Sequence, residues 1–209
     1  MNKRVSKRVA ICAGGTGGHI NAAISLGEMF KSHEFDVIYF SGTRYLDYQL
    51  FKPMRDQVFH PDAKPLRSKD TIGTFQNLFF NAFCFLTTMA KFLAKRPDAV
   101  LGAGGYICGP TLMAAKVLGI KTYIIEQNAV AGLTNRLLSK VSKKIFLNFE
   151  NTKGIERSDK VIVTGNPIRS SIRPSQNKIE DSLKILVFGG SLGAKQINEA
   201  VKLLAQRTW

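Results

Sequence analysis

Short apolar runs that each end in a glycine-rich or polar turn recur along this chain, and they constrain its fold more than any other feature. The densest turn, Gly14-Gly15-Thr16-Gly17-Gly18-His19 (the first glycine turn), follows the apolar run 9–13 and precedes a helical pattern at 20–30. The same order returns around residues 189–194. Glycine in such a turn lets backbone N–H groups close on an anion at a helix N-terminus, where the helix dipole favours negative charge. The pattern therefore predicts phosphate-binding turns.

The apolar runs are continuous rather than alternating, which is typical of strands covered on both faces in a parallel sheet. Runs that alternate with helical patterns predict an α/β fold with a Rossmann-like, doubly wound parallel sheet. Right-handed crossovers then place the carboxyl ends of all strands at one edge. The runs lie at 9–13, 37–40, 99–101, 122–125, 145–149 and 161–164, and the turns expected at that edge are 14–19, 102–106 (the second glycine turn), 126–128, 165–167 and 189–193.

Composition divides the chain into a long first part and a short last one. Residues 1–166 are expected to form one Rossmann-like domain, and the polar residues 167–182 are typical of a linker. Residues 183–209 offer one further apolar run, at 185–188, and one helical pattern. So short a segment cannot bury a core of its own. We expect only the beginning of a second Rossmann-like domain, cut short.

The chain carries 30 lysines and arginines against 15 aspartates and glutamates, a formal net charge of +15. By charge alone its partner could be nucleic acid, an acidic membrane surface or a phosphorylated substrate. Cys12, Cys84 and Cys108 are far apart and lack metal-ligand spacing, so neither a disulfide framework nor a metal site is expected. The apolar run behind the basic start is too short for a signal peptide. A reduced, cytosolic setting and no cofactor are expected.

A dinucleotide-binding fingerprint is the main rival explanation of the first glycine turn. It fits poorly, because Ile20 stands where a third glycine belongs and no acidic residue closes the second strand. Arg44 could still bind a 2′-phosphate, so an NADP-dependent oxidoreductase remains an alternative. A Walker A loop is excluded because the chain has no Gly-Lys dipeptide.

Polar residues at the expected carboxyl edge are candidates for chemistry. His19 lies where a helix begins, so its imidazole either accepts a proton from a substrate hydroxyl or only caps the turn. Glu126-Gln127-Asn128 ends a strand with three polar side chains, which is typical of a ligand site. Arg169 lies near the junction of the two halves, where its guanidinium either binds a diphosphate or is solvated. His33 and His60 are expected on the solvated surface.

Residues 72–93 form a long, unusually apolar helical pattern. One apolar stripe is expected in the core, with a more polar stripe opposite. The additional phenylalanines Phe80, Phe83, Phe85 and Phe92 widen the apolar surface, and with flanking cations they are typical of a helix on an anionic membrane, an over-sized core helix being the alternative. A spanning helix is not expected, because the apolar run stays below about 18 residues. The core stripe is Phe75, Leu78, Phe79, Ala82, Leu86, Met89 and Leu93, the polar stripe Asn77, Asn81, Cys84, Thr88 and Lys91, and the membrane patch Phe75, Phe79, Phe80, Phe83, Lys69, Lys91 and Lys95.

Five motifs in one order resemble glycosyltransferase family 28, the N-acetylglucosaminyltransferases of peptidoglycan synthesis. The similarity runs from residue 9 to about residue 205. Two departures stand out: Asn21-Ala22 follow Ile20 where the family usually has proline, and chains of the family run on much further. The motifs are Gly14-Gly15-Thr16-Gly17-Gly18-His19, Gly104-Gly105-Tyr106-Ile107-Cys108-Gly109-Pro110, Glu126-Gln127-Asn128, Gly165-Asn166-Pro167-Ile168-Arg169 and Gly189-Gly190-Ser191-Leu192-Gly193-Ala194.

The resemblance implies a GT-B fold, in which two Rossmann-like domains enclose the active site and no metal is bound. It implies an inverting transfer of N-acetylglucosamine from UDP-N-acetylglucosamine to the C4 hydroxyl of an undecaprenyl-diphosphate-linked MurNAc-pentapeptide, with His19 as the candidate base. It also implies a peripheral enzyme at the cytoplasmic face of the inner membrane. The implied donor contacts are Thr16, Gly17, Gly18, Asn128, Arg169 and Ser191, and the implied acceptor turns contain Gly14, Gly15, Gly104, Gly105 and Tyr106.

With the second domain cut short, we expect the chain to keep the acceptor and membrane half and to hold the nucleotide sugar poorly, because most uridine contacts would be missing. A non-catalytic fragment that binds the lipid diphosphate is a further alternative. A nucleic-acid partner is not expected, because the aromatic residues gather with aliphatic ones on one helix instead of punctuating a basic face.

Overall fold

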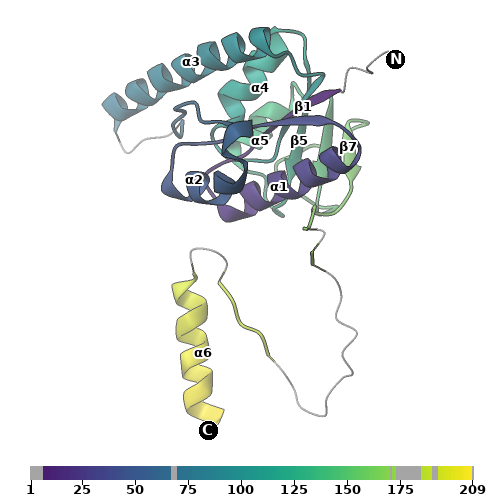
Figure 1. Ribbon diagram of the computed structural model, residues 1–209. Coiled ribbons are helices and arrows are strands. Elements are labelled where there is room, and N and C mark those ends of the chain that lie inside the picture. The colour runs from purple at the N-terminus through teal and green to yellow at the C-terminus, as the bar shows by residue number, and fades with distance from the viewer. Residues whose placement is uncertain (1–6, 67–69, 170, 173–184, 190–192, 209) are drawn as a thin grey trace. The chain divides into compact units, whose positions relative to one another are not determined.

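The computed structural model describes residues 7–66, 70–169, 171–172, 185–189 and 193–208 (Figure 1). The chain divides into two compact units, an N-terminal unit (Met1–Ser171) and a C-terminal unit (Ile172–Trp209). The boundary lies within the predicted linker, of which residues 173–182 lie outside the described residues. The roles assigned to the two domains stay predictions.

The N-terminal unit is built on a seven-stranded sheet in the order β3-β2-β1-β4-β5-β6-β7, with every neighbouring pair parallel (Figure 1). This confirms the predicted α/β class. The order reverses between β1 and β4, so the carboxyl ends of these two strands form the switch point where such sheets bind ligands. The strands are β1 (Arg8–Cys12), β2 (Asp36–Phe40), β3 (Val58–Phe59), β4 (Ala99–Gly102), β5 (Lys121–Glu126), β6 (Lys144–Leu147) and β7 (Val161–Val163).

Helices cover both faces of the sheet, and each face has its own core. In β1, Val9 and Ile11 pack into the core under α1 and α2, whereas Ala10 and Cys12 pack into the core under α3, α4 and α5. Alternate residues of one strand thus enter two cores, which explains its uninterrupted apolarity. The helices are α1 (Gly17–Ser32), α2 (Tyr45–Phe51), the 3-10 helix η1 (Lys52–Gln57), α3 (Thr71–Ala94), α4 (Cys108–Val117) and α5 (Leu133–Ser139).

The described part of the C-terminal unit contains one helix, α6 (Lys195–Thr208), as the helical pattern predicts. The prediction of a strand at residues 185–188 is wrong, since these residues form no strand. A strand needs a neighbour for its backbone hydrogen bonds, and the described residues of this unit offer none.

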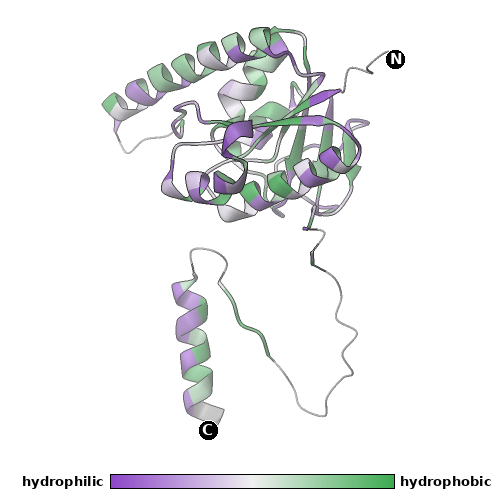
Figure 2. Ribbon diagram, in the orientation of Figure 1, coloured by the Kyte–Doolittle hydropathy of each residue, from purple (hydrophilic) through white to green (hydrophobic). Residues whose placement is uncertain are grey.

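The helix α3 buries most of its polar stripe and not the stripe that was expected in the core. Its buried residues are Asn81, Cys84, Thr88 and Phe92. Most of the expected core stripe lies outside, with exposed fractions of 72% for Phe75, 59% for Leu78, 72% for Phe79, 60% for Leu86 and 65% for Leu93, and only Met89 of this stripe packs against the core. The prediction that this stripe packs in the core is therefore wrong. Figure 2 shows hydrophobic residues recurring along α3.

The reversal in α3 has a physical cause in hydrogen bonding. Asn81 reaches the main chain of Lys64, donating to its carbonyl oxygen at 3.0 Å and accepting from its N–H at 3.1 Å. A polar side chain with both groups satisfied is buried at little cost. Phe92 and Phe85, expected to widen the exposed apolar surface, instead pack in or against the core beneath the helix.

Candidate functional site

The two glycine turns meet at the carboxyl ends of β1 and β4. The N–H of Gly14 donates to the carbonyl oxygen of Gly104 at 3.2 Å. At Gly105, which has a φ of +94°, an added Cβ would lie 2.2 Å from the carbonyl oxygen of Gly14. Glycine is therefore required there, because it alone adopts this conformation freely and lets the two backbones approach so closely.

His19, the last residue of the first glycine turn, lies against the second turn. Its ring packs on Gly104, where an added Cβ would lie 2.6 Å from the ring atom Cδ2. Its Nδ1 is 3.4 Å from the carbonyl oxygen of Gly14. When Nδ1–H donates to that oxygen, Nε2 is the unprotonated nitrogen of the neutral ring. The half-buried imidazole thus offers a proton acceptor where the turns meet.

The N-terminus of α1 keeps two amides free for a ligand. Thr16 caps the helix, and its hydroxyl oxygen accepts the N–H of His19 at 3.4 Å. Among the described residues, the N–H groups of Gly17 and Gly18 have no hydrogen-bond partner. Free amides at the positive end of a helix dipole bind anionic oxygens. The predicted anion-binding turn thus has two amide donors without a protein partner, of which that of Gly18 belongs to an exposed residue and that of Gly17 to a buried one.

A buried carboxylate, that of Asp47 on α2, holds the first glycine turn in place. Its Oδ1 accepts the N–H of Gly15 and the hydroxyl of Ser41, each at 3.0 Å. Its Oδ2 is buried and has no partner in the part of the chain described here. Sequence reasoning missed this residue. The available signal was that Asp47 is the single acidic residue of the segment 41–51, which leaves the carboxyl end of β2.

Tyr106 covers the first glycine turn from the second. Its Cε1 would lie 3.4 Å from a Cβ added at Gly15. The guanidinium carbon of Arg44 lies 5.1 Å from the centroid of the Tyr106 ring, and Arg44 forms no ion pair among the described residues. Burial, and then the carboxylate of Asp47, raise the pKa of Tyr106, so its hydroxyl stays protonated at neutral pH. A cation that is not neutralised therefore stands beside the turn.

Glu126 organises the polar turn at 126–128 from within. The side chain is 1% exposed and accepts four hydrogen bonds: from the N–H and Nδ2 of Asn128 at 3.0 and 2.9 Å, from the N–H of Gly132 at 3.1 Å and from Nδ2 of Asn135 at 3.0 Å. All its lone pairs are directed at the protein. Asn128 is exposed, and with its NH₂ group held by Glu126 it offers its side-chain oxygen to a ligand.

Arg169 lies beside the start of α1. Its guanidinium donates to the side-chain oxygen of Asn21, in the first turns of that helix. The contact brings Arg169 to the glycine-turn edge of the sheet. Asn21, which stands where the family usually has proline, thus accepts a hydrogen bond from Arg169.

Other predicted positions have different outcomes. Ser191 and Lys69 lie outside the described residues. The prediction that His60 is a solvated surface residue is wrong, because it is half-buried and its Nδ1–H donates to the carbonyl oxygen of Gly42 at 2.7 Å. His33 is exposed, as expected. Across the described ranges, no group of three His, Cys, Asp or Glu residues is arranged to hold a metal ion.

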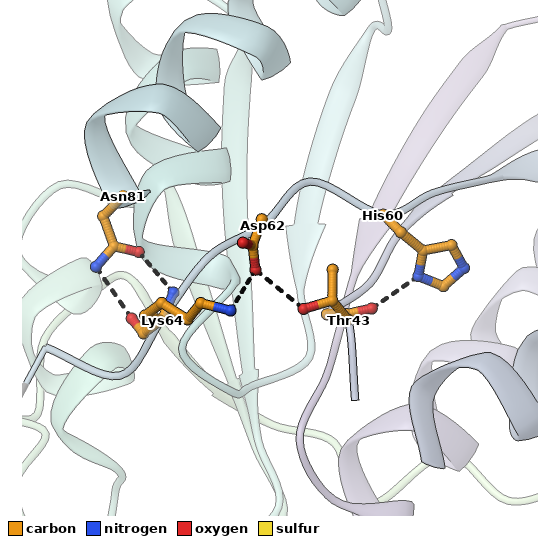
Figure 3. A network of polar contacts seen from close by, with 6 residues as sticks. Thr43, His60, Asp62, Lys64 and Asn81 are labelled. Carbon is orange, nitrogen blue, oxygen red and sulfur yellow. Dashed lines mark hydrogen bonds and ion pairs between the residues drawn. The ribbon is translucent and has the colours of Figure 1, made fainter. Parts of the chain in front are cut away.

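A polar network links α3 to the loop after β2 (Figure 3). Beyond the bonds between Asn81 and the Lys64 main chain, the Lys64 ammonium pairs with Asp62 at 2.6 Å. The hydroxyl of Thr43 donates to the same carboxylate oxygen at 3.1 Å. Because Thr43 belongs to the loop that leads to Asp47, the buried face of α3 and the first glycine turn share one connected framework.

Comparison with known proteins agrees with this site. Residues 9–147 match the glycosyltransferase family 28 N-terminal domain. The chain is 37% identical over 211 residues to the UDP-N-acetylglucosamine--N-acetylmuramyl-(pentapeptide) pyrophosphoryl-undecaprenol N-acetylglucosamine transferase of Bacillus subtilis (strain 168), covering 93% of this chain and 56% of that protein. It is 34% identical to the protein of the same name from Geobacter sulfurreducens, covering 91% of this chain and 55% of the relative.

Solved structures lead to the same family. The crystal structure of Acinetobacter baumannii MurG is similar with a TM-score of 0.75 and 31% identity, over 92% of this chain and 55% of that one. The UDP-GlcNAc 2-epimerase of Methanocaldococcus jannaschii, with a TM-score of 0.56 and 15% identity over 76% of this chain and 45% of its own, shares the fold alone. The likeness to MurG confirms the GT-B type of the Rossmann-like unit and sets aside the NADP-dependent oxidoreductase. The chain spans about half the length of the relatives it matches. From the matched domain and these relatives together, it belongs to glycosyltransferase family 28.

Proposed function

We propose that this chain is the acceptor-binding half of a hexosyltransferase of peptidoglycan synthesis. The reaction is the transfer of N-acetylglucosamine from UDP-N-acetylglucosamine to the C4 hydroxyl of undecaprenyl-diphospho-MurNAc-pentapeptide. The observation that carries this proposal is the meeting of the two glycine turns, where the ring of His19 packs on Gly104 and two amides have no protein partner. The names of the relatives support the choice of donor and of a lipid-linked acceptor.

In this proposal Nε2 of His19 takes the proton of the C4 hydroxyl while the hydroxyl oxygen forms its bond to the anomeric carbon. UDP leaves from the opposite face, so the transfer inverts the configuration. The resemblance assigns Gly17 and Gly18 to the donor and Gly14 and Gly15 to the acceptor. In this proposal the acceptor diphosphate instead binds the amides of Gly17 and Gly18, since those of Gly14 and Gly15 are engaged within the fold. The donor contacts assigned to Thr16, Asn128, Arg169 and Ser191 remain part of the proposal.

We further propose that α3 docks on the anionic cytoplasmic surface of the inner membrane. The helix has 24 residues and is about 36 Å long at 1.5 Å per residue. Its outer face exposes Phe75, Phe79 and Phe83, and the exposed Lys91 and Lys95 lie near its C-terminal end. Apolar side chains flanked by cations fit the interface of an anionic bilayer.

A spanning arrangement of α3 is not favoured, although the reason differs from the one expected. By length and composition alone the helix is apolar enough to cross a membrane, so the expectation of too short an apolar run is wrong. The stronger argument is that its opposite face is buried in the N-terminal unit, through Cys84 and Phe92 in the core shared with α4. A helix packed into a folded domain along one face is available to lipid only along the other.

Two measurements test the proposal. Calorimetric titration of the chain with UDP-N-acetylglucosamine is expected to show binding weaker than micromolar. Micromolar affinity would contradict the assignment of the donor site to the part of the relatives that this chain does not span. The chain joined to the second domain of the Bacillus subtilis relative is expected to transfer labelled N-acetylglucosamine to the lipid acceptor.

In that joined protein His19→Ala is expected to lower kcat by about 100-fold or more while acceptor affinity stays unchanged. Unchanged turnover would remove His19 from the mechanism. If the joined protein binds the lipid acceptor and transfers nothing, the chain is a lipid-diphosphate-binding fragment instead.

A further inference from the structure

An apolar groove of about 380 Å³ lies between α3, α4 and α5, on the side of the second glycine turn. Its rim is formed by Leu66, Leu78, Met113 and Leu137, which are 44%, 59%, 40% and 50% exposed. Leu138 and Val141 lie among the residues that line it further. Exposed apolar side chains that converge from three helices on one concavity are typical of a site that receives an apolar ligand.

The groove reaches the first glycine turn through one shared residue. Tyr106 lines the groove, and its ring also covers Gly15. The guanidinium of Arg44 lies over the same ring, and the ammonium of Lys64 lies 5.2 Å from the ring centroid of Phe80 on α3. The guanidinium of Arg44 thus stands beside Tyr106, where the groove approaches the first glycine turn. Most of the remaining wall is apolar, with Asn81 and Thr134 as its polar members. This distribution is complementary to an amphiphile with an anionic head and a hydrocarbon tail.

The groove is distinct from the outer face of α3 but continuous with it. Phe75, Phe79 and Phe83 do not line it, whereas Leu78, on the same helix, belongs to its rim. Leu78 is thus an exposed apolar side chain that a hydrocarbon chain at the outer face could contact on its way into the groove.

We propose that this groove binds the isoprene units nearest the diphosphate of a polyprenyl diphosphate. The inference rests on the proposed function, which places the acceptor diphosphate at the first glycine turn. The groove then positions the diphosphate, because an isoprene chain bound between α3, α4 and α5 directs its diphosphate past Tyr106 toward the amides of Gly17 and Gly18. Recognition of the lipid thereby includes part of the tail as well as the charged head.

The test compares inorganic pyrophosphate with geranyl diphosphate, both soluble, by calorimetric titration of the 209-residue chain. Geranyl diphosphate is expected to bind at least 10-fold more tightly, because burial of its hydrocarbon adds to the same contacts with the head group. Leu137→Asp is expected to abolish this advantage and leave pyrophosphate affinity unchanged. The matched control is Leu133→Asp on the same helix, since Leu133 is 42% exposed and does not line the groove. It is expected to keep the advantage.

Equal affinity of the native chain for both ligands, or an equal loss in the two leucine variants, would overturn the groove assignment and leave the proposed function standing. Binding of neither ligand would overturn both. If a second copy of the chain occupies the groove instead, sedimentation should show a dimer that Leu137→Asp dissociates, and geranyl diphosphate should bind no more tightly than pyrophosphate. That result would also overturn the assignment. If Leu137→Asp does not fold, Met113→Gln on α4 removes apolar surface from the opposite wall with the same expected loss.

Discussion

Asp47→Ala is expected to release the first glycine turn from the rest of the fold. In the native protein one oxygen of this buried carboxylate accepts two hydrogen bonds, from the N–H of Gly15 and from the hydroxyl of Ser41. Alanine leaves both donors without a partner, at a cost of about 1–3 kcal/mol each. The free energy of unfolding should therefore fall by about 2–6 kcal/mol, a large part of the roughly 5–15 kcal/mol available to a domain.

Asp47→Asn separates the hydrogen bonds from the charge. The carboxamide oxygen can accept the same two donors, so the turn stays anchored at Gly15. The substitution removes a buried charge that has no ion partner among the described residues. This gain offsets the cost of burying an NH₂ group at the position of Oδ2, which has no hydrogen-bond partner there. Stability within about 1 kcal/mol of the native protein is expected.

Urea unfolding followed by circular dichroism measures these differences, and amide hydrogen exchange of Gly15 by NMR reports on the turn itself. Exchange at Gly15 should accelerate in Asp47→Ala and stay slow in Asp47→Asn. Asp56→Ala, with a side chain 94% exposed, is the control and should change stability by less than about 0.5 kcal/mol. The reasoning is refuted if Asp47→Ala is as stable as the control, or if the asparagine variant loses as much stability as the alanine variant.

Three further predictions follow from single contacts. Gly104→Ala should lower the Tm and shift the NMR signals of the His19 imidazole, because the glycine has a φ of +106° and a Cβ there would lie 2.6 Å from the ring; an unmoved imidazole would contradict this. Glu126→Ala should cost more than about 3 kcal/mol in urea unfolding, since four donors lose their acceptor, and a loss below about 1 kcal/mol would count against it. Burial raises the pKa of Cys84 to about 12, so the folded protein disfavours the thiolate. The free energy of unfolding should therefore fall as the pH rises above about 9, the ordinary pKa of a cysteine thiol. Thiol reagents at pH 8 should label Cys84 only in denaturant, and fast labelling of the native chain would disprove its burial.

The strands were predictable because their burial on two faces leaves a continuous apolar run. Six of the seven strands of the sheet coincide with such runs. β3 was missed, because it consists only of Val58 and Phe59, both half-buried at the edge of the sheet. So short a strand exists because β2 offers it a partner, which is a tertiary effect and not a local pattern.

The glycine turns were also predictable, since the close approach of Gly14 to Gly105 requires residues without side chains. The residues that hold the turns were not. Asp47 accepts from an amide 32 positions earlier in the chain, and Asn81 binds the main chain 17 positions earlier. Such partners depend on how α2 and α3 pack on the sheet, and residue type alone does not predict them.

The orientation of α3 shows where helical periodicity stops being informative. An amphipathic pattern predicts that two faces differ, but which face is buried depends on the partners available. Here Asn81 finds both polar groups of a main chain, so the polar face is buried and Phe75 and Phe79 remain 72% exposed. Exposed apolar surface costs roughly 25 cal/mol per Å² relative to burial. A fold that leaves a row of phenylalanines exposed along a helix of 24 residues is stabilised by any apolar phase that covers them, which is the physical basis of the proposed docking of α3 on a bilayer.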